Sequence, residues 1–540
     1  MWAIGITTNT SNLLLQSPRG LRPIVIGHGF VSGRSALVSR PQHFSSIKYY
    51  SSDAPKPDDK SAARNQPPKE PKAAFAKTNP SIDAANQAMP PGWEDNPDLD
   101  ITAFSELPHR FFGTNQHIRI NEDFKESLRQ IIWQFRAPIR YAFAYGSGVF
   151  SQGASSSIPS SFSPHPHPPE AVTKWQQDGG KMIDFIFGVS YTEHWHSINL
   201  QEHNDHYSFL KWGGSGPISK IQDNFGAGVY FNPYVITNGI MIKYGVVNLD
   251  TICRDLTEWD TLYLAGRLQK PVKILRDDPR VRLANQMNLM SAVRTALLML
   301  PERFSEKQLY EKIAGISYLG DPRMTLGGEN PRKVSNIVSN QLPNFRQLYV
   351  PLIDSLPNVA FNDRNIPTEA GWEREDVIAR SGRNPKDAPG GTDGFMMQQD
   401  MDPIRRGNVV RRLPKGFRQK LYYQYQKKFQ IPGSAFDKII DEAADEDATG
   451  LKRRQGGEFE QRIGQQDDLD EVVSRCIHNT ISWPSTSQSV KSFFTAGLGR
   501  SWKYYQEKRS KNRAGKSPAT DKIENAKVET QNGKKDTKVD

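Results

Sequence analysis

The sequence is poor in features that would define several classes of protein. Only two cysteines, Cys253 and Cys476, occur in 540 residues, which excludes a disulfide-held scaffold and a zinc site built from cysteines. No run of about 18 apolar residues occurs, so a membrane-spanning helix is not expected. The best candidate, Met287–Leu300, is short and carries Arg294. Acidic residues are absent from residues 1–52.

This acid-free start is rich in Arg and Ser, a composition typical of a mitochondrial transit peptide. A basic disordered tail is the alternative interpretation. Residues 53–103 form a linker whose Pro, Lys, Ala and Asp content predicts disorder, and the charged tail 509–540 is expected to be disordered as well.

The positive balance of charge is the main compositional signal. The formal net charge is +11 and the sequence pI is about 9.3. Such a balance favours nucleic acid, an anionic membrane surface or phosphate ligands, without choosing among them. The length allows two or three domains.

One stretch combines a buried strand with a glycine turn. Residues 139–145 are apolar and β-favouring, and they end at Gly146-Ser147-Gly148. Glycines there allow a sharp turn and let backbone N–H groups approach an anion closely. A second apolar stretch, 182–187, carries one acid, Asp184, and a carboxylate in a buried strand is costly unless it is paired or holds a metal.

Together the turn and the strand-borne acid suggest a nucleotidyltransferase site, in which the turn holds triphosphate and Asp184 holds Mg²⁺. A plain turn is the alternative for Gly-Ser-Gly alone. Ile186 stands where a second acid would share the strand face, so Asp255 or Asp250 could complete the metal site, or could be solvated helix acids. Residues 151–180, rich in Ser, Pro and His, form a flexible insertion between turn and acid.

Basic residues follow the acid along the chain. Lys243 lies in a third predicted strand, 241–247, from which it could meet a phosphate. Arg267, Lys270 and Lys273 lie close together and would suit a polyphosphate or a lipid phosphate. The alternative for Lys243 is a surface lysine whose ammonium extends into solvent, and the alternative for the other three is a solvated basic surface.

Four histidines between residues 194 and 206 invite a metal interpretation. Their H-x-H and H-x-x-H spacings fit no common zinc pattern, and no cysteine lies nearby. Hydrogen-bonded or phosphate-contacting histidines are expected instead (His194, His196, His203 and His206).

The second half of the chain predicts a mainly helical region. Residues 276–363 contain helical spacing and a capping box at Ser305 and Gln308, which suggests a winged-helix-like domain. Polar residues 364–405 are expected to form a loop insertion, and residues 406–508 form a C-terminal region.

That region ends in a predicted basic amphipathic helix, 489–508. Its apolar face includes aromatic side chains, while its lysines and arginine lie largely off this face, a pattern that suits an anionic membrane interface. A helix packed on the core is the alternative. The predicted membrane-binding residues are Phe493, Phe494, Leu498 and Trp502.

Several longer segments occur together in this chain. They are Tyr145-Gly146-Ser147-Gly148-Val149-Phe150, Met182-Ile183-Asp184-Phe185, Trp195-His196-Ser197, His206-Tyr207-Ser208-Phe209-Leu210, Gly226-Ala227-Gly228-Val229-Tyr230, Ile242-Lys243-Tyr244-Gly245-Val246 and Leu264-Ala265-Gly266-Arg267-Leu268-Gln269-Lys270-Pro271. Through these segments the chain resembles the mitochondrial translocator assembly and maintenance family, which acts as the peripheral mitochondrial CDP-diacylglycerol synthase. The resemblance covers about 104–360 and resumes from about 410 to 507.

The resemblance implies transfer of CMP from CTP to phosphatidate, giving CDP-diacylglycerol and pyrophosphate for cardiolipin synthesis. It implies a peripheral enzyme on the matrix side of the mitochondrial inner membrane. It also implies an α/β (α+β) fold: a nucleotidyltransferase-like mixed sheet over 104–275, then the winged-helix-like domain and the membrane-binding helix.

The resemblance also suggests roles for individual residues, which are hypotheses at this point. Gly146, Ser147 and Gly148 would bind the nucleotide, and Asp184 would ligate Mg²⁺, with Asp255 as a second candidate. Lys243 would act with Asp184 in catalysis. Arg267, Lys270 and Lys273 would bind phosphate.

Two alternative functions are weighed against this one. A nucleotidyltransferase acting on RNA would use the basic surface and the winged helix, although the resemblance implies no nucleic-acid partner. A non-catalytic import-assembly scaffold would form no CTP-dependent product.

Overall fold

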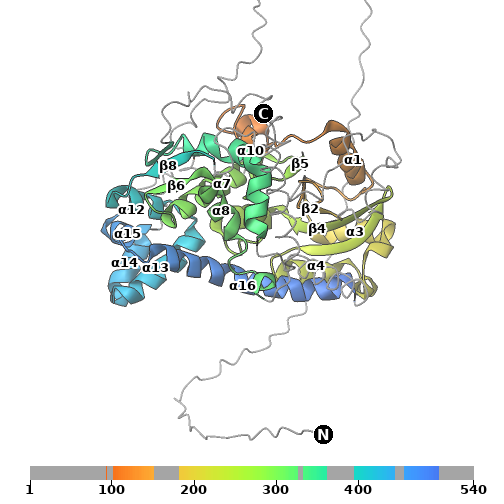
Figure 1. The fold of residues 1–540 in the computed structure, drawn as a ribbon. Coiled ribbons are helices and arrows are strands. Elements are labelled where there is room, and N and C mark those ends of the chain that lie inside the picture. The colour runs from red at the N-terminus through yellow and green to blue at the C-terminus, as the bar shows by residue number, and fades with distance from the viewer. Residues whose placement is uncertain are drawn as a thin grey trace, which may run out of the picture. The chain divides into compact units, whose positions relative to one another are not determined.

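The computed structural model describes residues 93, 101–150, 182–325, 332–361, 394–443 and 455–497, which belong to the compact unit Lys77–Asp540 (Figure 1). The predicted transit peptide 1–52, the insertion 151–180 and the tail 509–540 lie outside the described residues, as does nearly all of the linker 53–103.

A five-stranded mixed sheet forms the first part of the fold. The strand order is β3-β4-β2-β1-β5, with β2 parallel to β4 and the other neighbours antiparallel. This confirms the predicted mixed α/β sheet and its first three predicted strands. The strands are β1 (Tyr141–Tyr145), β2 (Ile183–Val189), β3 (Tyr230–Thr237), β4 (Ile240–Asn248) and β5 (Lys273–Arg276).

Helices connect and cover these strands. Asn121 caps the first of them, where its side chain accepts a hydrogen bond from the Phe124 N–H. The α-helices are α1 (Glu122–Trp133), α3 (Thr192–Glu202), α4 (Ser215–Asn224), α5 (Leu249–Glu258) and α6 (Ala265–Leu268). Short 3-10 helices are η2 (Phe104–Glu106), η3 (Thr114–Gln116), η4 (Asn204–His206) and η5 (Phe209–Gly213).

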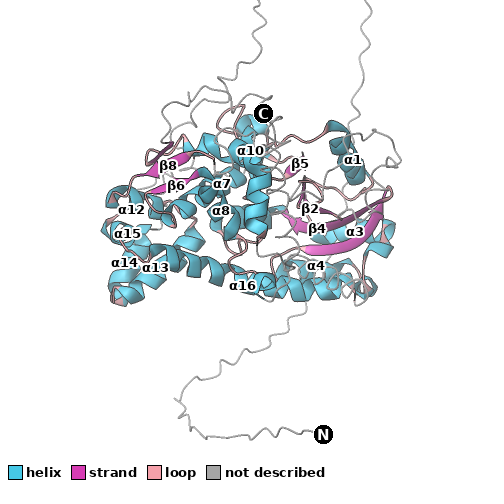
Figure 2. Cartoon of the chain, viewed as in Figure 1, coloured by secondary structure: helices cyan, strands magenta, loops and turns pink. Residues whose placement is uncertain are grey.

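A helical region with a small second sheet follows. The predicted capping box is present, with Ser305 and Gln308 bonded reciprocally at the start of α8. The elements are α7 (Pro279–Leu298), β6 (Arg303–Ser305), α8 (Glu306–Ile316), α9 (Pro322–Thr325), α10 (Lys333–Ile353), β7 (Val359–Phe361) and β8 (Met396–Gln399). This second sheet has the strand order β6-β8-β7, and Figure 2 shows β6 and β8 in magenta among the helices.

The prediction of a continuous loop over 364–405 is wrong at its end. Strand β8 pairs antiparallel with both β6 and β7, and Pro403 begins the next helix. The pairing partner β6 lies about ninety residues earlier in the chain, so no local hairpin signal marks the strand. Residues 362–393 lie outside the described residues.

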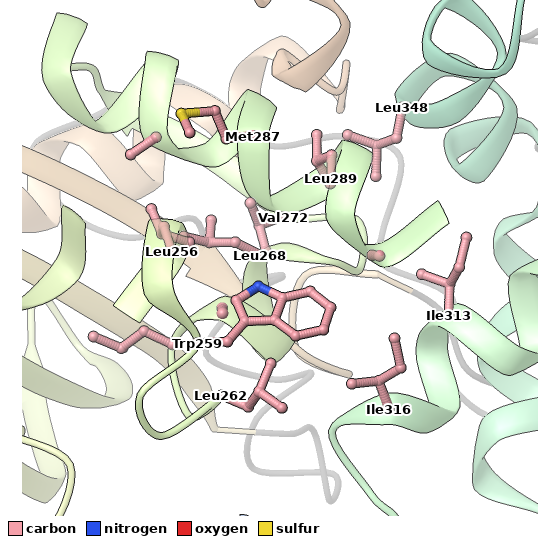
Figure 3. Close-up of a cluster of buried hydrophobic side chains, with 14 of the residues drawn as sticks. Leu256, Trp259, Leu262, Leu268, Val272, Met287, Leu289, Ile313, Ile316 and Leu348 are labelled. Carbon is pink, nitrogen blue, oxygen red and sulfur yellow. The ribbon is translucent and has the colours of Figure 1, made fainter. Parts of the chain in front are cut away.

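The sheet part and the helical part share one hydrophobic core. Figure 3 shows Trp259, which follows α5, among Leu256, Leu262 and Leu268. The buried Trp259 Nε1 donates to Asn288 Oδ1 of α7 at 2.9 Å. Residues from α7, α8 and α10 complete the cluster, namely Met287, Leu289, Ile313, Ile316 and Leu348.

Five helices end the described chain: α12 (Pro403–Arg411), α13 (Lys415–Lys428), α14 (Gly433–Ala443), α15 (Glu458–Gly464) and α16 (Leu469–Ala496). The structure differs from the predicted helix 489–508, because α16 begins at Leu469 and ends at Ala496. Gly497 leaves helical geometry with φ 81°. Leu498 and Trp502 lie outside the described residues.

No helix among the described residues is long and apolar enough to cross a bilayer.

Candidate active site

Antiparallel pairing of β1 with β2 brings the glycine turn to the strand-borne acid. Tyr145, the last residue of β1, pairs with Asp184, the second residue of β2. The turn Gly146-Ser147 that follows β1 therefore lies beside the Asp184 carboxylate. A Cβ atom on Gly146 would lie 3.4 Å from Asp184 Oδ2.

The turn itself requires glycine at one of these positions. Gly146 has φ +82°, a left-handed conformation that L side chains rarely adopt, and its carbonyl accepts from the Val149 and Phe150 N–H groups. Gly148 serves packing instead, because a Cβ atom there would lie 2.9 Å from the Met182 carbonyl oxygen. Gly146 and Ser147 line a cavity, and Gly148 is not among its lining residues.

A lysine from the neighbouring parallel strand reaches the same acid. Asp184 of β2 pairs in register with Lys243 of β4, and the Lys243 Nζ lies 3.7 Å from Asp184 Oδ1. The ammonium also lies 4.4 Å from the centroid of the Phe231 ring, a cation–π distance. Both charged side chains line the cavity and are partly exposed in it.

Arg267 enters the cavity from α6. Its guanidinium lies 3.8 Å from the centroid of the Tyr263 ring and donates to the Tyr263 carbonyl and to the Tyr145 hydroxyl. These contacts fix the plane of the guanidinium, and a planar, oriented guanidinium binds phosphate oxygens well. Burial raises the pKa of Tyr145, so its hydroxyl stays protonated near neutral pH.

Lys270 and Lys333 line the cavity near the same aromatic ring. Their Nζ atoms lie 5.3 Å and 5.4 Å from the centroid of Tyr318. Lys270 also donates to Ser317 Oγ at 2.7 Å and to the Gly266 carbonyl. Burial, with smaller effects from Arg267 and Lys333, holds the pKa of Lys270 well below its ordinary value. A bound anion would offset that cost.

The cavity joins the sheet part, the helical region and α16. It has a volume of about 190 Å³, and its charged lining consists of four basic and two acidic side chains (Lys243, Arg267, Lys270, Lys333, Asp184 and Asp321). Tyr318, Asp321 and Gln341 line it from the helical region, and Ile481 and Ser485 from α16. These side chains, with Lys333, were not predicted, because no local pattern links them to the turn.

The structure does not bring Asp255 to Asp184. Asp255 is buried outside the cavity lining, and its carboxylate accepts hydrogen bonds from the Thr261 N–H, the Thr261 hydroxyl and the Leu264 and Ala265 N–H groups. These four bonds fold the chain after α5 and cap α6. Its role as a second metal ligand at Asp184 is therefore contradicted by its position.

Lys273 is also placed elsewhere. It lies on β5, is buried, and donates from Nζ to the Ile118 carbonyl at 2.7 Å. Burial lowers the pKa of Lys273 to about 8. It does not line the cavity, so the grouping of Lys273 with Arg267 and Lys270 at one phosphate is not what the structure shows.

The histidines form a hydrogen-bonded network outside the cavity. His196 is buried, with Nδ1 2.8 Å from the Tyr207 hydroxyl and Nε2 2.8 Å from Gln222 Oε1. His206 Nδ1 lies 2.9 Å from the Tyr244 hydroxyl. His203, Asp205 and His206 also place one potential ligand atom each within 4.8 Å of the others, and none of the three lines the cavity. His203 Nε2 lies 3.3 Å from the Gln134 carbonyl oxygen, so the expectation of hydrogen-bonded histidines is confirmed for His196, His203 and His206.

The mixed sheet, with a glycine turn beside a strand-borne acid and a basic cavity, defines a nucleotidyltransferase-like α/β protein. A family model described as mitochondrial phosphatidate cytidylyltransferase matches residues 128–511. The chain belongs to the mitochondrial phosphatidate cytidylyltransferase family, which confirms the resemblance noted from its segments.

Individual relatives support this assignment. The chain is 46% identical over 247 residues to the mitochondrial phosphatidate cytidylyltransferase of Schizosaccharomyces pombe, and 44% identical over 253 residues to that of Saccharomyces cerevisiae. Each alignment covers 46% of this chain, and 58% and 60% of the two yeast proteins. The Xenopus laevis protein of the same name is 36% identical over 383 residues, which cover 71% of this chain and 93% of that protein.

Proposed function

We propose that the chain transfers CMP from CTP to phosphatidate, forming CDP-diacylglycerol and pyrophosphate. One observation carries this proposal: a single cavity combines the Gly146-Ser147 turn, the Asp184 carboxylate and four basic side chains. The names of the relatives supply the substrate pair, CTP and phosphatidate. They favour neither RNA nucleotidyl transfer nor a non-catalytic scaffold.

The reaction must bring two anions together. A phosphatidate oxygen, already ionised near neutral pH, attacks the α-phosphorus of CTP, and the bond from that phosphorus to the pyrophosphate oxygen breaks. The nucleophile needs no strong base, so alignment and charge neutralisation supply most of the rate gain. Backbone N–H groups and the hydroxyl at Gly146-Ser147 would hold the triphosphate. Lys243 and Arg267 would neutralise it on the sheet side, and Lys270 and Lys333 would neutralise the second phosphate.

The residues present suit Mg²⁺. This ion prefers oxygen ligands and is commonly bound through one or two carboxylates together with substrate phosphates and water. Asp184 offers a partly exposed carboxylate in the cavity, and its pairing with Tyr145 sets it beside the turn. Asp184 would therefore hold the ion, which when bound would withdraw charge from the triphosphate.

The location of the protein is part of the proposal. The relatives are named mitochondrial proteins, and residues 1–52 have the composition of a transit peptide. We infer a peripheral enzyme on the matrix side of the inner membrane, where an anionic lipid surface holds the phosphatidate. Phe493 and Phe494, 43% and 51% exposed near the end of α16, would contact that surface.

Product formation tests the proposal. The purified chain is supplied with labelled CTP, Mg²⁺ and phosphatidate in vesicles, with Asp184→Asn assayed in parallel. Labelled CDP-diacylglycerol from wild type and a loss of roughly 100-fold or more in the variant are expected. No lipid product from folded wild-type protein contradicts the reaction, and equal turnover by the variant contradicts the role of Asp184.

A further inference from the structure

The second half of α16 has one buried polar face and one exposed face on which large apolar side chains lie among Thr486 and Ser489. On the buried face, Gln488 Nε2 donates to the Val229 carbonyl at 2.9 Å, and Lys491 Nζ donates to the carbonyls of Gln222 and Phe225 at the end of α4. The helix is thus fixed to β3 and α4. On the other side lies an exposed row formed by Trp483, Val490, Phe493 and Phe494.

A short aromatic turn, η5, lies beside the end of this helix. A Cβ atom on Gly497 would lie 3.6 Å from the Ser208 Cβ, the residue that caps η5. Leu210 packs inward against the buried cluster of Tyr207, Ile218 and Tyr230. Two aromatic side chains of the same turn face outward instead, Phe209 with 57% and Trp212 with 85% of their area exposed.

The turn is anchored rather than loose, so its exposed aromatics are held at the surface. Ser208 accepts a hydrogen bond from the Leu210 N–H, and Leu210 is fixed by the cluster below it. Within the described residues, most of the area of these two aromatic side chains stays exposed on the five-residue turn. Such amphipathic aromatics are favoured where protein meets the headgroup region of a bilayer.

The charge of the two segments that carry these aromatic side chains favours an anionic partner. Between the exposed Asp205 and Asp223, the segment 206–222, which contains η5, has no Asp or Glu and carries Lys211 and Lys220. Residues 472–496 of α16 likewise include no acid, while Arg475 of this segment pairs with Glu471 just before it and Lys491 is buried against backbone carbonyls. Both segments that supply exposed aromatics therefore lack the negative charge that an anionic lipid surface would repel.

We propose that Phe209 and Trp212 of η5 form a second membrane contact, which inserts beside the C-terminal half of α16 into an anionic bilayer surface. The inference rests on the proposed function, since a lipid substrate requires a lipid surface. Two contacts on separate segments would fix the orientation of the protein on the bilayer, which a single helix leaves free to rotate about its axis. Lys211, whose Nζ lies 5.6 Å from the Trp212 ring centroid, would meet lipid phosphates.

Vesicle flotation of the full chain tests this contact. The vesicles contain phosphatidylcholine with about one fifth phosphatidate or cardiolipin, and the variant is Phe209→Ser with Trp212→Ser. Trp133→Ser is the matched control, because Trp133 is 69% exposed on α1. We expect the double variant to lose roughly tenfold or more in vesicle partitioning, and the control to float like wild type. Circular dichroism checks that all three proteins are folded.

Each outcome decides the inference. Equal flotation of wild type and the double variant overturns it, as does a wild type that does not float. A wild type that self-associates in vesicle-free buffer through Phe209 and Trp212 assigns the surface to a protein contact instead. CDP-diacylglycerol formation by wild type from a short-chain, water-soluble phosphatidate is measured separately, so failure of the proposed function remains distinguishable.

Discussion

The Lys243 Nζ lies 3.7 Å from Asp184 Oδ1, across two neighbouring parallel strands held in register. The distance exceeds that of a hydrogen bond, so the lysine orients the carboxylate electrostatically and leaves its oxygens accessible in the cavity. A rigid sheet thus fixes one negative and one positive group where two phosphates are proposed to meet.

Replacing Lys243 should impair turnover while the Mg²⁺ requirement persists. Lys243→Met removes one charge facing the triphosphate, and kcat/KM for CTP should fall roughly 10- to 100-fold. Steady-state kinetics over a range of Mg²⁺ concentrations measures both effects. Unchanged kcat/KM would show that Lys243 meets no substrate phosphate.

The turn conformation predicts different outcomes for two glycines. Gly146→Ala forces a Cβ atom into a φ of +82° beside Asp184, and should cost about 1–2 kcal/mol of stability together with most of the activity. Gly315→Ala is the control, because a Cβ atom in α8 at that position meets nothing within 4 Å. It should stabilise the protein by about 0.5–1 kcal/mol. Thermal unfolding and turnover are measured for both variants. Equal stability and equal turnover of the two would show that the left-handed conformation of Gly146 causes no strain on substitution.

Asp255 should be a structural residue. Asp255→Ala leaves the four donors from Thr261, Leu264 and Ala265 without their acceptor, and should lower the free energy of unfolding by roughly 3 kcal/mol. The dependence of Asp255→Ala turnover on Mg²⁺ concentration should match that of wild type, whereas that of Asp184→Asn should not. A shifted Mg²⁺ dependence in Asp255→Ala would return this acid to the metal site.

Lys333 should contribute to binding of an anionic substrate from the helical region. Lys333→Met removes a cation that shares the Tyr318 ring with Lys270, and should raise the KM for one substrate roughly tenfold. The control is Lys438→Met, at an exposed position on α14 outside the cavity. Which KM rises, that for CTP or that for phosphatidate, assigns the phosphate that Lys333 meets. If neither KM changes, Lys333 is not a substrate contact.

His196 should make the protein less stable in mild acid. Burial lowers the pKa of His196 to about 4 from an ordinary value of 6.5. Between these values the unfolded chain binds a proton that the folded imidazole does not, so the free energy of unfolding falls as pH decreases from 6.5 towards 4. The difference amounts to about 3 kcal/mol.

Thermal midpoints of wild type and His196→Gln at pH 7 and pH 4.5 measure this effect. The variant starts from lower stability because it disturbs the bonds to Tyr207 and Gln222, but it should lose less on acidification. An equal loss in both proteins would exclude His196 as the titrating group.

Patterns among neighbouring residues correctly predicted the elements that depend on interactions close in the sequence. The strand before Gly146, the strand around Asp184 and the capping box at Ser305 all depend on neighbours in sequence, and each is present. Asp255 was misassigned because its hydrogen-bond donors become visible only when the chain folds back after α5. Similarly, α16 begins twenty residues before the predicted start, since its packing on β3 and α4 outweighs an interior rich in Ser and Thr.

The cavity wall was the least predictable part of the site. Lys333 and Tyr318 come from the helical region, and their approach to Lys270 depends on the core that this region shares with the sheet part. A charged residue on a predicted helix gives no sign of such a contact. The sequence therefore predicts the side of the cavity formed by the glycine turn, Asp184 and Lys243. The side formed by the helical region becomes apparent only in the folded structure.

The fate of the individual phosphates of CTP tests the central claim most directly. CTP labelled at the α-phosphate and CTP labelled at the γ-phosphate are incubated separately with the full chain, Mg²⁺ and phosphatidate vesicles. Cytidylyl transfer predicts that the α-label enters the lipid and the γ-label appears in pyrophosphate. If the γ-label enters the lipid, or if neither label does while the protein is folded, the proposed reaction is wrong.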